Sequence, residues 1–238
     1  MEIHAGQHWV ANIAGMSVNM DTLIVMWLVM GVMLIVAFFA TRNLSIIPSK
    51  GQALLENVMS FFWGMTDSLG HDGKKHTPLL ATLFLFILTA NLVGQLPWRI
   101  YHLEHGEFAS PTNDINMTLA MAVVVLIYYI GAGVQKKGLK YFLHYFKPSP
   151  LLAPLNMMED IIRPFSLAVR LFANILAGEI LIMVMLGMGA AAATGLNKAG
   201  LLLPLPFMLF EIFVAVIQAL VFTLLTSAYL SLALEDNH

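Results

Sequence analysis

The chain has 238 residues, of which 59% are hydrophobic and only 11% are charged, and its mean hydropathy is +0.79. These values lie far outside those of ordinary soluble domains and predict an integral membrane protein. The chain has no cysteine, which excludes disulfide bonds and thiolate metal sites, and no stripe of basic residues typical of nucleic-acid binding. A net charge of −2 points to no particular partner.

Five apolar tracts follow in chain order, and each approaches or exceeds the roughly 20 residues that cross a bilayer. We expect one all-α membrane domain over residues 1–238, with an outer N-terminal tail at 1–20 and transmembrane helices at 21–40, 78–97, 115–134, 155–189 and 201–234. The last two tracts are too long for a perpendicular crossing, since roughly 34 residues make a helix of about 50 Å. We therefore expect these two helices to be tilted.

Residues 50–70 carry apolar side chains at helical spacing, from Leu54 to Met65, but the segment is short for a span and is flanked by charge. We predict an amphipathic helix on the cytoplasmic membrane surface. The alternative is a sixth, short span, which would invert the orientation of every later tract and remove the charge asymmetry between the loops.

Basic residues are distributed unequally between the two sets of loops. The alternate loops hold Arg99 and Lys198, whereas the segments after the first and third tracts hold eight: Arg42, Lys50, Lys74, Lys75, Lys136, Lys137, Lys140 and Lys147. Because loops rich in lysine and arginine stay in the cytoplasm, we expect the N-terminus outside and the C-terminus inside.

Two groups of residues have a weak resemblance to metal sites. They are His102, Glu104, His105 and Glu107 in an outer loop and His4 and His8 in the N-terminal tail. Loops and chain ends of this kind are usually solvated, and neither group recurs as a ligand cluster. We therefore predict no metal and no cofactor.

The fourth and fifth tracts contain polar and ionisable residues at membrane depth, where such groups usually face a protein interior or a water-filled cavity and mark an ion path. They are Glu159, Asp160, Arg163, Ser166, Arg170, Asn174, Glu179, Glu211 and Gln218. Arg170 is the most informative of them, because a guanidinium cannot lose its proton at any accessible pH and is costly to bury.

Helical spacing places Ser166, Arg170 and Asn174 on one face of the fourth helix, because they repeat at four-residue intervals. Glu179 follows Arg170 by nine residues, a rotation of about 900°, and therefore lies on roughly the opposite face and about 13 Å further along the helix. Arg170 and Glu179 are thus not predicted to form a local ion pair.

Antiparallel packing of the last two helices permits two matched layers. Arg170 and Gln218 would lie deep in the membrane, and Glu179 and Glu211 would lie nearer the outer surface. The two carboxyl groups could line an aqueous entrance, while the fixed charge of Arg170 blocks a direct cation leak. In an alternative interpretation, the two carboxyls share a proton or bond to Asn174 and Gln218 as packing contacts.

The cytoplasmic start of the fourth helix carries three further charges. We expect Arg163 to reach lipid phosphate at the inner boundary. Glu159 and Asp160 are expected to be solvated there, where carboxylates complement the helix dipole, or else to line an inner exit.

The segment from Ser166 to Glu179, Ser-Leu-Ala-Val-Arg-Leu-Phe-Ala-Asn-Ile-Leu-Ala-Gly-Glu, resembles the signature of subunit a of the rotary F-type ATP synthase, Leu-Arg-Leu-Phe-Gly-Asn-x-x-Ala-Gly-Glu. Val169 and Ala173 replace the usual leucine and glycine, and every polar position is unchanged. Residues 217–230 are similar to the final helix of that family. Residues 111–116, Pro-Thr-Asn-Asp-Ile-Asn, resemble its cyanobacterial, chloroplast and many other bacterial versions.

The resemblance implies a stator ion-channel subunit whose two offset half-channels carry protons to and from the carboxylates of a c-subunit ring, with the last two helices forming a long tilted hairpin against that ring. By position, it implies ring contact for Arg170, with Asn174 and Gln218 as polar neighbours, and an outer half-channel at Glu179 and Glu211. Candidates for the inner half-channel are Ser166, Glu159 and Asp160.

The resemblance also implies partners and a location. The partners are the c-subunit ring, the peripheral-stalk subunit b, the other subunits of the complex and the lipid bilayer, without nucleic acid. The chain performs no chemical catalysis alone and lies in a bacterial plasma membrane, or alternatively in a thylakoid membrane.

Three alternatives remain at this level. A sodium-translocating version would share Arg170, because ion selectivity resides largely in the ring. A self-contained secondary transporter would use Arg170, Glu179 and Glu211 to bind a solute, but the sequence has neither inverted repeats nor corresponding broken helices. An intramembrane enzyme or quinone-binding subunit would need haem-ligating histidine pairs or a nucleophile set, which the spans lack.

Overall fold

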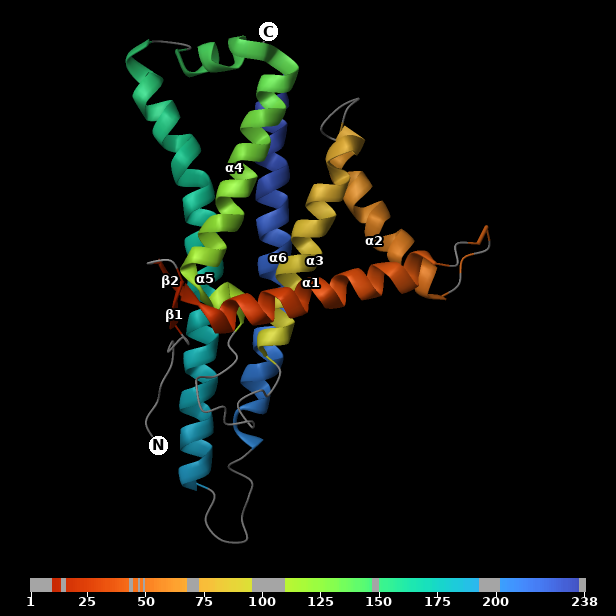
Figure 1. The fold of residues 1–238 in the computed structure, drawn as a ribbon, viewed down its shortest axis with the longest axis vertical. Helices are drawn as coiled ribbons and strands as arrows, with labels where there is room; N and C mark the ends of the chain where they lie inside the picture. Colours follow the sequence, from red (N-terminus) through yellow and green to blue (C-terminus); the bar gives the residue numbers. More distant parts are fainter. Residues whose placement is uncertain are drawn as a thin grey trace.

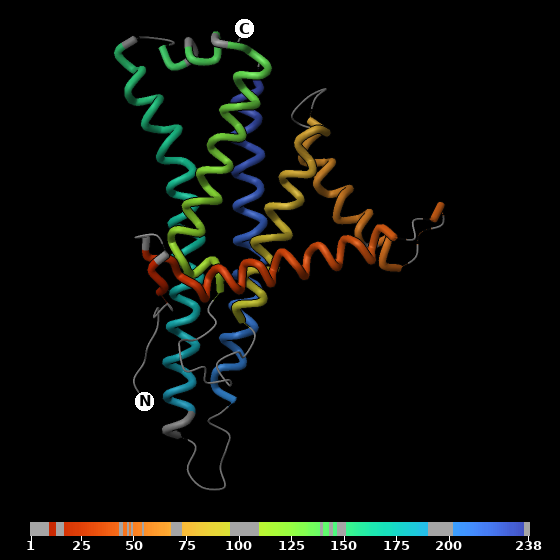
Figure 2. The backbone as a smooth tube through the Cα atoms, viewed as in Figure 1, coloured from red at the N-terminus to blue at the C-terminus, as the bar shows by residue number. Residues whose placement is uncertain are grey.

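The computed structural model describes residues 10–13, 16–42, 45–46, 48, 50–67, 73–95, 110–146, 150–192 and 202–235. These residues form six α-helices, several short 3-10 helices and one two-stranded sheet (Figures 1 and 2). Five of the helices are long and apolar enough to cross a membrane, which confirms the predicted all-α membrane fold.

The N-terminal segment contains a strand pair that we did not predict. Strand β1 (Val10–Ile13) pairs antiparallel with β2 (Met16–Asn19), so the expected tail at 1–20 is partly ordered as a hairpin. Strands of four residues are too short to show an alternating pattern, so they were not predictable from the sequence. The residues with a weak resemblance to metal sites, at 4, 8 and 102–107, lie outside the described residues.

Helices α1 (Met20–Thr41), α2 (Lys50–Asp67) and α3 (Thr77–Gly94) form a triangle, in which α2 leads from the far end of α1 back to the start of α3 (Figure 1). Phe62 of α2 is buried against Leu80 and Phe84 of α3, whereas Trp63 is exposed. Helix α2 is therefore amphipathic and packs against α3, and it covers nearly the residues of the predicted surface helix. Its location on the cytoplasmic membrane surface stays a prediction.

The remaining helices are α4 (Ile115–Lys137), α5 (Ala153–Ala192) and α6 (Leu205–Leu234). Asp114 caps α4 by accepting a hydrogen bond from the Asn116 backbone N–H at 2.8 Å, and Gly138, at φ 63°, ends it. Helix α6 begins at Leu205, four residues after the predicted start at 201. Leu203 and Pro204 form a turn there, because the fixed φ of proline suits the beginning of a helix.

The core lies where α3, α4, α5 and α6 pack together. Its members include the fully buried side chains of Ile87, Val125, Leu171 and Phe222, one from each helix. Large apolar side chains on α1, by contrast, are mostly exposed, as Phe39 is at 67%. Because lipid chains are as apolar as leucine, such a surface is stable in a bilayer.

Helix α1 runs crosswise to α5 and α6, which are antiparallel neighbours (Figures 1 and 2). Helices that cross at a large angle cannot all follow the membrane normal, so either α1 or the α5–α6 pair is strongly inclined. If α5 and α6 are the inclined helices, part of the axial separation of about 13 Å between Arg170 and Glu179 is a displacement within the membrane plane.

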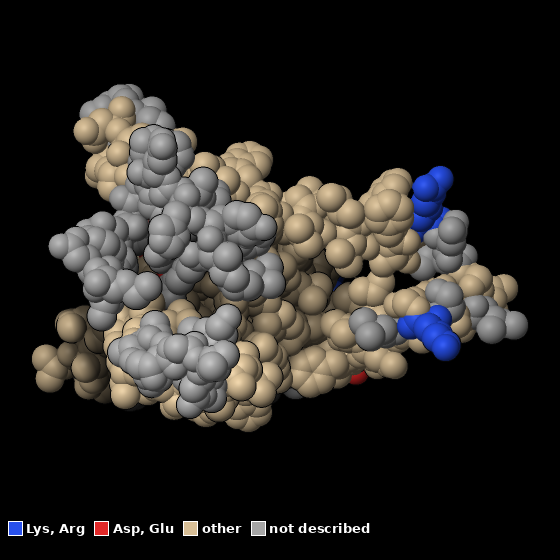
Figure 3. Space-filling view, turned by 90° about the horizontal axis from the view of Figure 1, so that it is seen from below, with Lys and Arg blue, Asp and Glu red and all other residues tan. Residues whose placement is uncertain are grey.

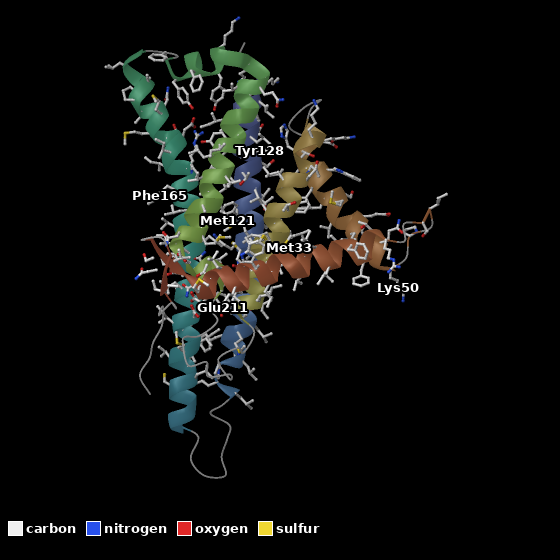
Figure 4. The ribbon with its side chains drawn as sticks, in the orientation of Figure 1. Met33, Lys50, Met121, Tyr128, Phe165 and Glu211 are labelled. Atoms are coloured by element: carbon white, nitrogen blue, oxygen red, sulfur yellow. The ribbon has the colours of Figure 1, made fainter. Side chains whose placement is uncertain are left out.

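Basic side chains lie at the ends of the helices. Seen from below, the visible lysine and arginine atoms gather on one side of the described surface, where α1 ends and α2 begins (Figure 3). Lys50 lies at that side (Figure 4). At the end of α6, the Lys136 ammonium group donates to the Leu234 carbonyl oxygen at 2.7 Å and so stabilises the C-terminus of that helix.

Candidate functional site

One face of α5 is open and polar. Ser166, Arg170 and Asn174 are all exposed, whereas Leu167 and Leu171 point into the core, so the structure places the three polar residues together as their spacing predicts. Phe165, beside Ser166, is exposed as well (Figure 4). Arg170 makes no ion pair or hydrogen bond within the part of the chain that the structure describes. Its charge therefore requires a partner outside these residues.

The contact between α5 and α6 contains an amide pair beside this face. The Asn174 amide donates to Gln218 Oε1 at 3.0 Å, and Gln218 is only 3% exposed. Asn174 and Gln218 thus bond to each other and not to Glu179 or Glu211. The packing alternative in which the two carboxyls bond to these amides is wrong in this respect.

Glu179 and Glu211 lie in a second layer of the same helix contact. Glu211 of α6 is 8% exposed and lies against Gly178 of α5, where a Cβ atom would stand 2.6 Å from Glu211 Oε1. Because Glu179 is the next residue along α5, the two carboxyl groups come from neighbouring elements at one level of the hairpin. Glycine at 178 leaves the space that the Glu211 carboxyl occupies.

A polar network that the sequence analysis missed surrounds this layer. It is centred on the short 3-10 helix η3 (Pro111–Asn113), where the Asn113 amide donates to Glu179 Oε2. The Thr112 hydroxyl donates to Asn91 Oδ1 of α3 at 2.6 Å and lies 2.6 Å from the Ser110 hydroxyl. The polar run before the third tract and the asparagine inside the second were signals that could have identified these residues.

A second polar cluster lies at the N-terminal end of α5, on the 3-10 helix η4 (Gly138–Phe146) and the start of α5. The Tyr145 hydroxyl donates to the Asp160 carboxylate, and Arg163 pairs with Glu159 and, at 3.5 Å, with Asp160. The Arg163 guanidinium also stands 5.7 Å from the centre of the Tyr229 ring. Arg163 thus has protein partners, which the expectation that it reaches lipid phosphate did not include. Asp160 is half-buried, whereas Glu159 is exposed.

This second cluster lines a pocket that can hold several water molecules, with about 90 Å³ available to their centres. Burial raises the pKa of the Tyr141 phenol, and burial together with the hydrogen bond to Asp160 raises that of Tyr145. Both phenols therefore remain neutral near neutral pH and can donate hydrogen bonds to the pocket.

The fold and these sites define a multi-pass membrane protein with two polar layers at the contact of its longest helices and a water-sized pocket at one end of them. The family model described as ATP synthase A chain matches residues 23–231, and the chain belongs to this family. It is therefore a membrane-sector component of ATP synthase that serves ion transport linked to ATP synthesis. The matched range includes every candidate site residue.

Proposed function

We propose that this chain is the stator ion-channel subunit of a rotary F-type ATP synthase. Two offset half-channels would carry protons to and from the carboxyl groups of a c-subunit ring and so couple the ion gradient to rotation and ATP synthesis. The observation that carries this proposal is the separation of the Arg170 charge from the two carboxyl groups. Arg170 is exposed without a partner among the described residues, whereas Glu179 and Glu211 lie at the contact with α6.

Arg170 would face the ring and act on its carboxyl groups electrostatically. A fixed positive charge favours the ionised form of a carboxyl group that passes it. The same charge repels a proton or a metal cation and so prevents a direct leak between the half-channels. Asn174 and Gln218 lie beside Arg170 as the polar neighbours of this contact, and a neutralised ring carboxyl can then enter lipid at tolerable cost.

Glu179 and Glu211 would form the outer half-channel, where protons pass between the carboxyls and water on their way to the ring. The inner half-channel would open near Ser166 and the pocket around Asp160, with Glu159 at its exposed rim. With α5 and α6 as the helices inclined to the membrane normal, the two paths would be offset laterally as well as in depth (Figure 1). A lateral offset is what obliges a ring carboxyl to rotate between them.

The same proposal assigns partners and orientation. The ring would cover the open face of α5, and subunit b of the peripheral stalk and the other subunits would complete the complex in a bacterial plasma membrane. The N-terminus would lie outside and the C-terminus in the cytoplasm. Catalysis of ATP synthesis would belong to other subunits.

The test is ion flux through the purified complex reconstituted in lipid vesicles. ATP addition is expected to acidify the vesicle interior equally well with and without sodium, and the chain is expected to copurify with an oligomeric ring. Sodium uptake on ATP addition, without acidification of the vesicle interior, would identify the sodium version. Transport of a solute by the chain without a ring would refute the proposal in favour of a secondary transporter.

A further inference from the structure

We infer that Asn113 is a positioning residue of the outer half-channel, which holds the Glu179 carboxyl group at the α5–α6 contact. This inference rests on the proposed role of Glu179 in proton transfer. Its starting point is the hydrogen bond from the Asn113 amide to Glu179 Oε2, which joins residues 66 positions apart in the sequence. An amide cannot carry the proton itself, so Asn113 would act through Glu179.

The position of Asn113 is fixed by its surroundings. Its side chain is 2% exposed and that of Thr112 is 0% exposed, and η3 contacts α1, α3, α4 and α5. At Gly94, the end of α3, a Cβ atom would lie 2.3 Å from the Ser110 Cβ atom, so the chain before η3 approaches α3 more closely than any other residue would allow. The Ser110 hydroxyl also bonds to the Ala90 carbonyl oxygen at 3.1 Å.

These contacts fix the position of η3, whereas the side chain of glutamate is flexible. Asn113 therefore sets the geometry of its hydrogen bond to Glu179. Its amide donates to Glu179 Oε2 and so fixes the orientation of the carboxyl group. Holding one oxygen in this way presents the other in a constant direction. Such placement matters for proton transfer, which requires donor and acceptor within hydrogen-bond reach.

The network can also accommodate water. Asn113 Oδ1 and Asn91 Nδ2 are buried and form no hydrogen bond with the described residues. Buried amide groups are normally paired with protein or with water. The two amides belong to the same η3 network through Thr112, so this network is suited to hold water beside Glu179.

The inference is tested by exchanging donor and acceptor. In membranes that contain the complete complex, Asn113→Leu removes the donor at similar size and is expected to lower ATP-driven proton pumping by on the order of tenfold, the effect of losing a hydrogen bond to a charged group. The double variant Asn113→Asp with Glu179→Gln restores one amide and one carboxyl with their positions exchanged. This double variant is expected to pump protons faster than Asn113→Asp alone or Glu179→Gln alone. Asn116→Leu, which changes the same residue type three positions later and leaves Glu179 untouched, is the matched control.

Each result separates this inference from the proposed function. Normal pumping by Asn113→Leu, with Glu179→Gln impaired, would overturn the positioning role alone. Normal pumping by Glu179→Gln would overturn the outer half-channel itself. If Asn113→Leu fails to assemble, the double variant provides the test. A pumping rate above that of Glu179→Gln supports the inference, and a rate no higher than that of Glu179→Gln overturns it.

Discussion

Arg170 combines a permanent charge with an exposed position on α5, and it makes no hydrogen bond or ion pair with any other described residue. Arg170→Ala should therefore abolish ATP-driven proton pumping while the subunit still assembles, because no packing contact depends on the guanidinium. Pumping in membrane vesicles and the amount of assembled complex measure the two effects. Val169→Leu, which introduces the residue usual in the family signature, should pump normally. An Arg170→Ala complex that pumps at the normal rate would refute the role assigned to Arg170.

Gly178 controls the position of Glu211, because a Cβ atom there would stand 2.6 Å from Oε1 and 2.9 Å from Cδ of that side chain. These atoms end a flexible side chain, so Gly178→Ala should displace the carboxyl and leave the helices intact. We expect pumping to slow by roughly tenfold or more, as small misplacements of reacting groups do, and less completely than in Arg170→Ala. Glu211→Gln should have a comparable effect.

Gly187 offers the matched control for this substitution. It lies in the same helix, and a Cβ atom there would meet nothing within 4 Å. Gly187→Ala should therefore pump at the normal rate. Loss of assembly in both Gly178→Ala and Glu211→Gln would instead show that this layer serves packing.

The residue-scale predictions from sequence were good within one helix and poor between elements. A 3.6-residue period suffices to place Ser166, Arg170 and Asn174 on one face, and the structure shows all three exposed. The bond between Asn113 and Glu179 depends on how η3 packs against α5, and no periodicity within either segment contains that information. Arg163, by contrast, pairs with Glu159 and Asp160 of its own helix, at spacings of four and three residues, so helical periodicity could have predicted these ion pairs.

At the scale of elements, the 3-10 helix η4 is attached to the start of α5 through Tyr145. Tyr145 connects them through its hydroxyl, which donates to Asp160, and through its backbone carbonyl, which accepts from the Asn156 amide at 2.9 Å. Tyr145→Phe removes the first bond, and hydrogen bonds to charged groups contribute about 1.5–3 kcal/mol. Amide hydrogen exchange in η4 should therefore become roughly tenfold faster or more, as measured on the purified complex.

Tyr128→Phe is the control for that measurement. It removes a hydroxyl of the same kind, whose partner is the His76 ring at 2.8 Å and which lies on α4, away from η4. Exchange in η4 should stay unchanged in this variant. Equal exchange in Tyr145→Phe and the normal chain would show that the backbone contacts of η4, and not the phenol, attach it to α5.

Hydropathy was enough to predict the five long helices, because a segment that spans hydrocarbon must be helical and long. Element ends depended on local chemistry: the prolines delay the start of α6, and Gly138 ends α4. The β1–β2 hairpin was missed, since its short strands are held partly by a distant contact, the Asn19 amide donating to Asp114 at 2.7 Å. Short elements stabilised by tertiary contacts carry little signal of their own.

For the molecule as a whole, the lengths of α5 and α6 indicated tilt, but not that α1 would run across them (Figure 1). Helix length limits the angle to the membrane normal without setting it, because packing against neighbours sets the tilt. The crossing bears on the proposed function, since a strong inclination of α5 would turn part of the separation between Arg170 and Glu179 into a lateral offset between the two proposed half-channels.

The absence of cysteine from the chain makes the orientation in the membrane directly measurable. Single cysteines can be introduced at Asn12 of β1, Lys140 of η4 and Glu235 after α6, which are all exposed. A maleimide that cannot cross membranes should label Asn12→Cys only in intact cells and the other two only in inverted vesicles, because lysine-rich loops stay inside. If α2 were a sixth span, Asn12→Cys and Lys140→Cys would be labelled from the same side. That result would refute the five-span topology and would invert the proposed direction of the half-channels.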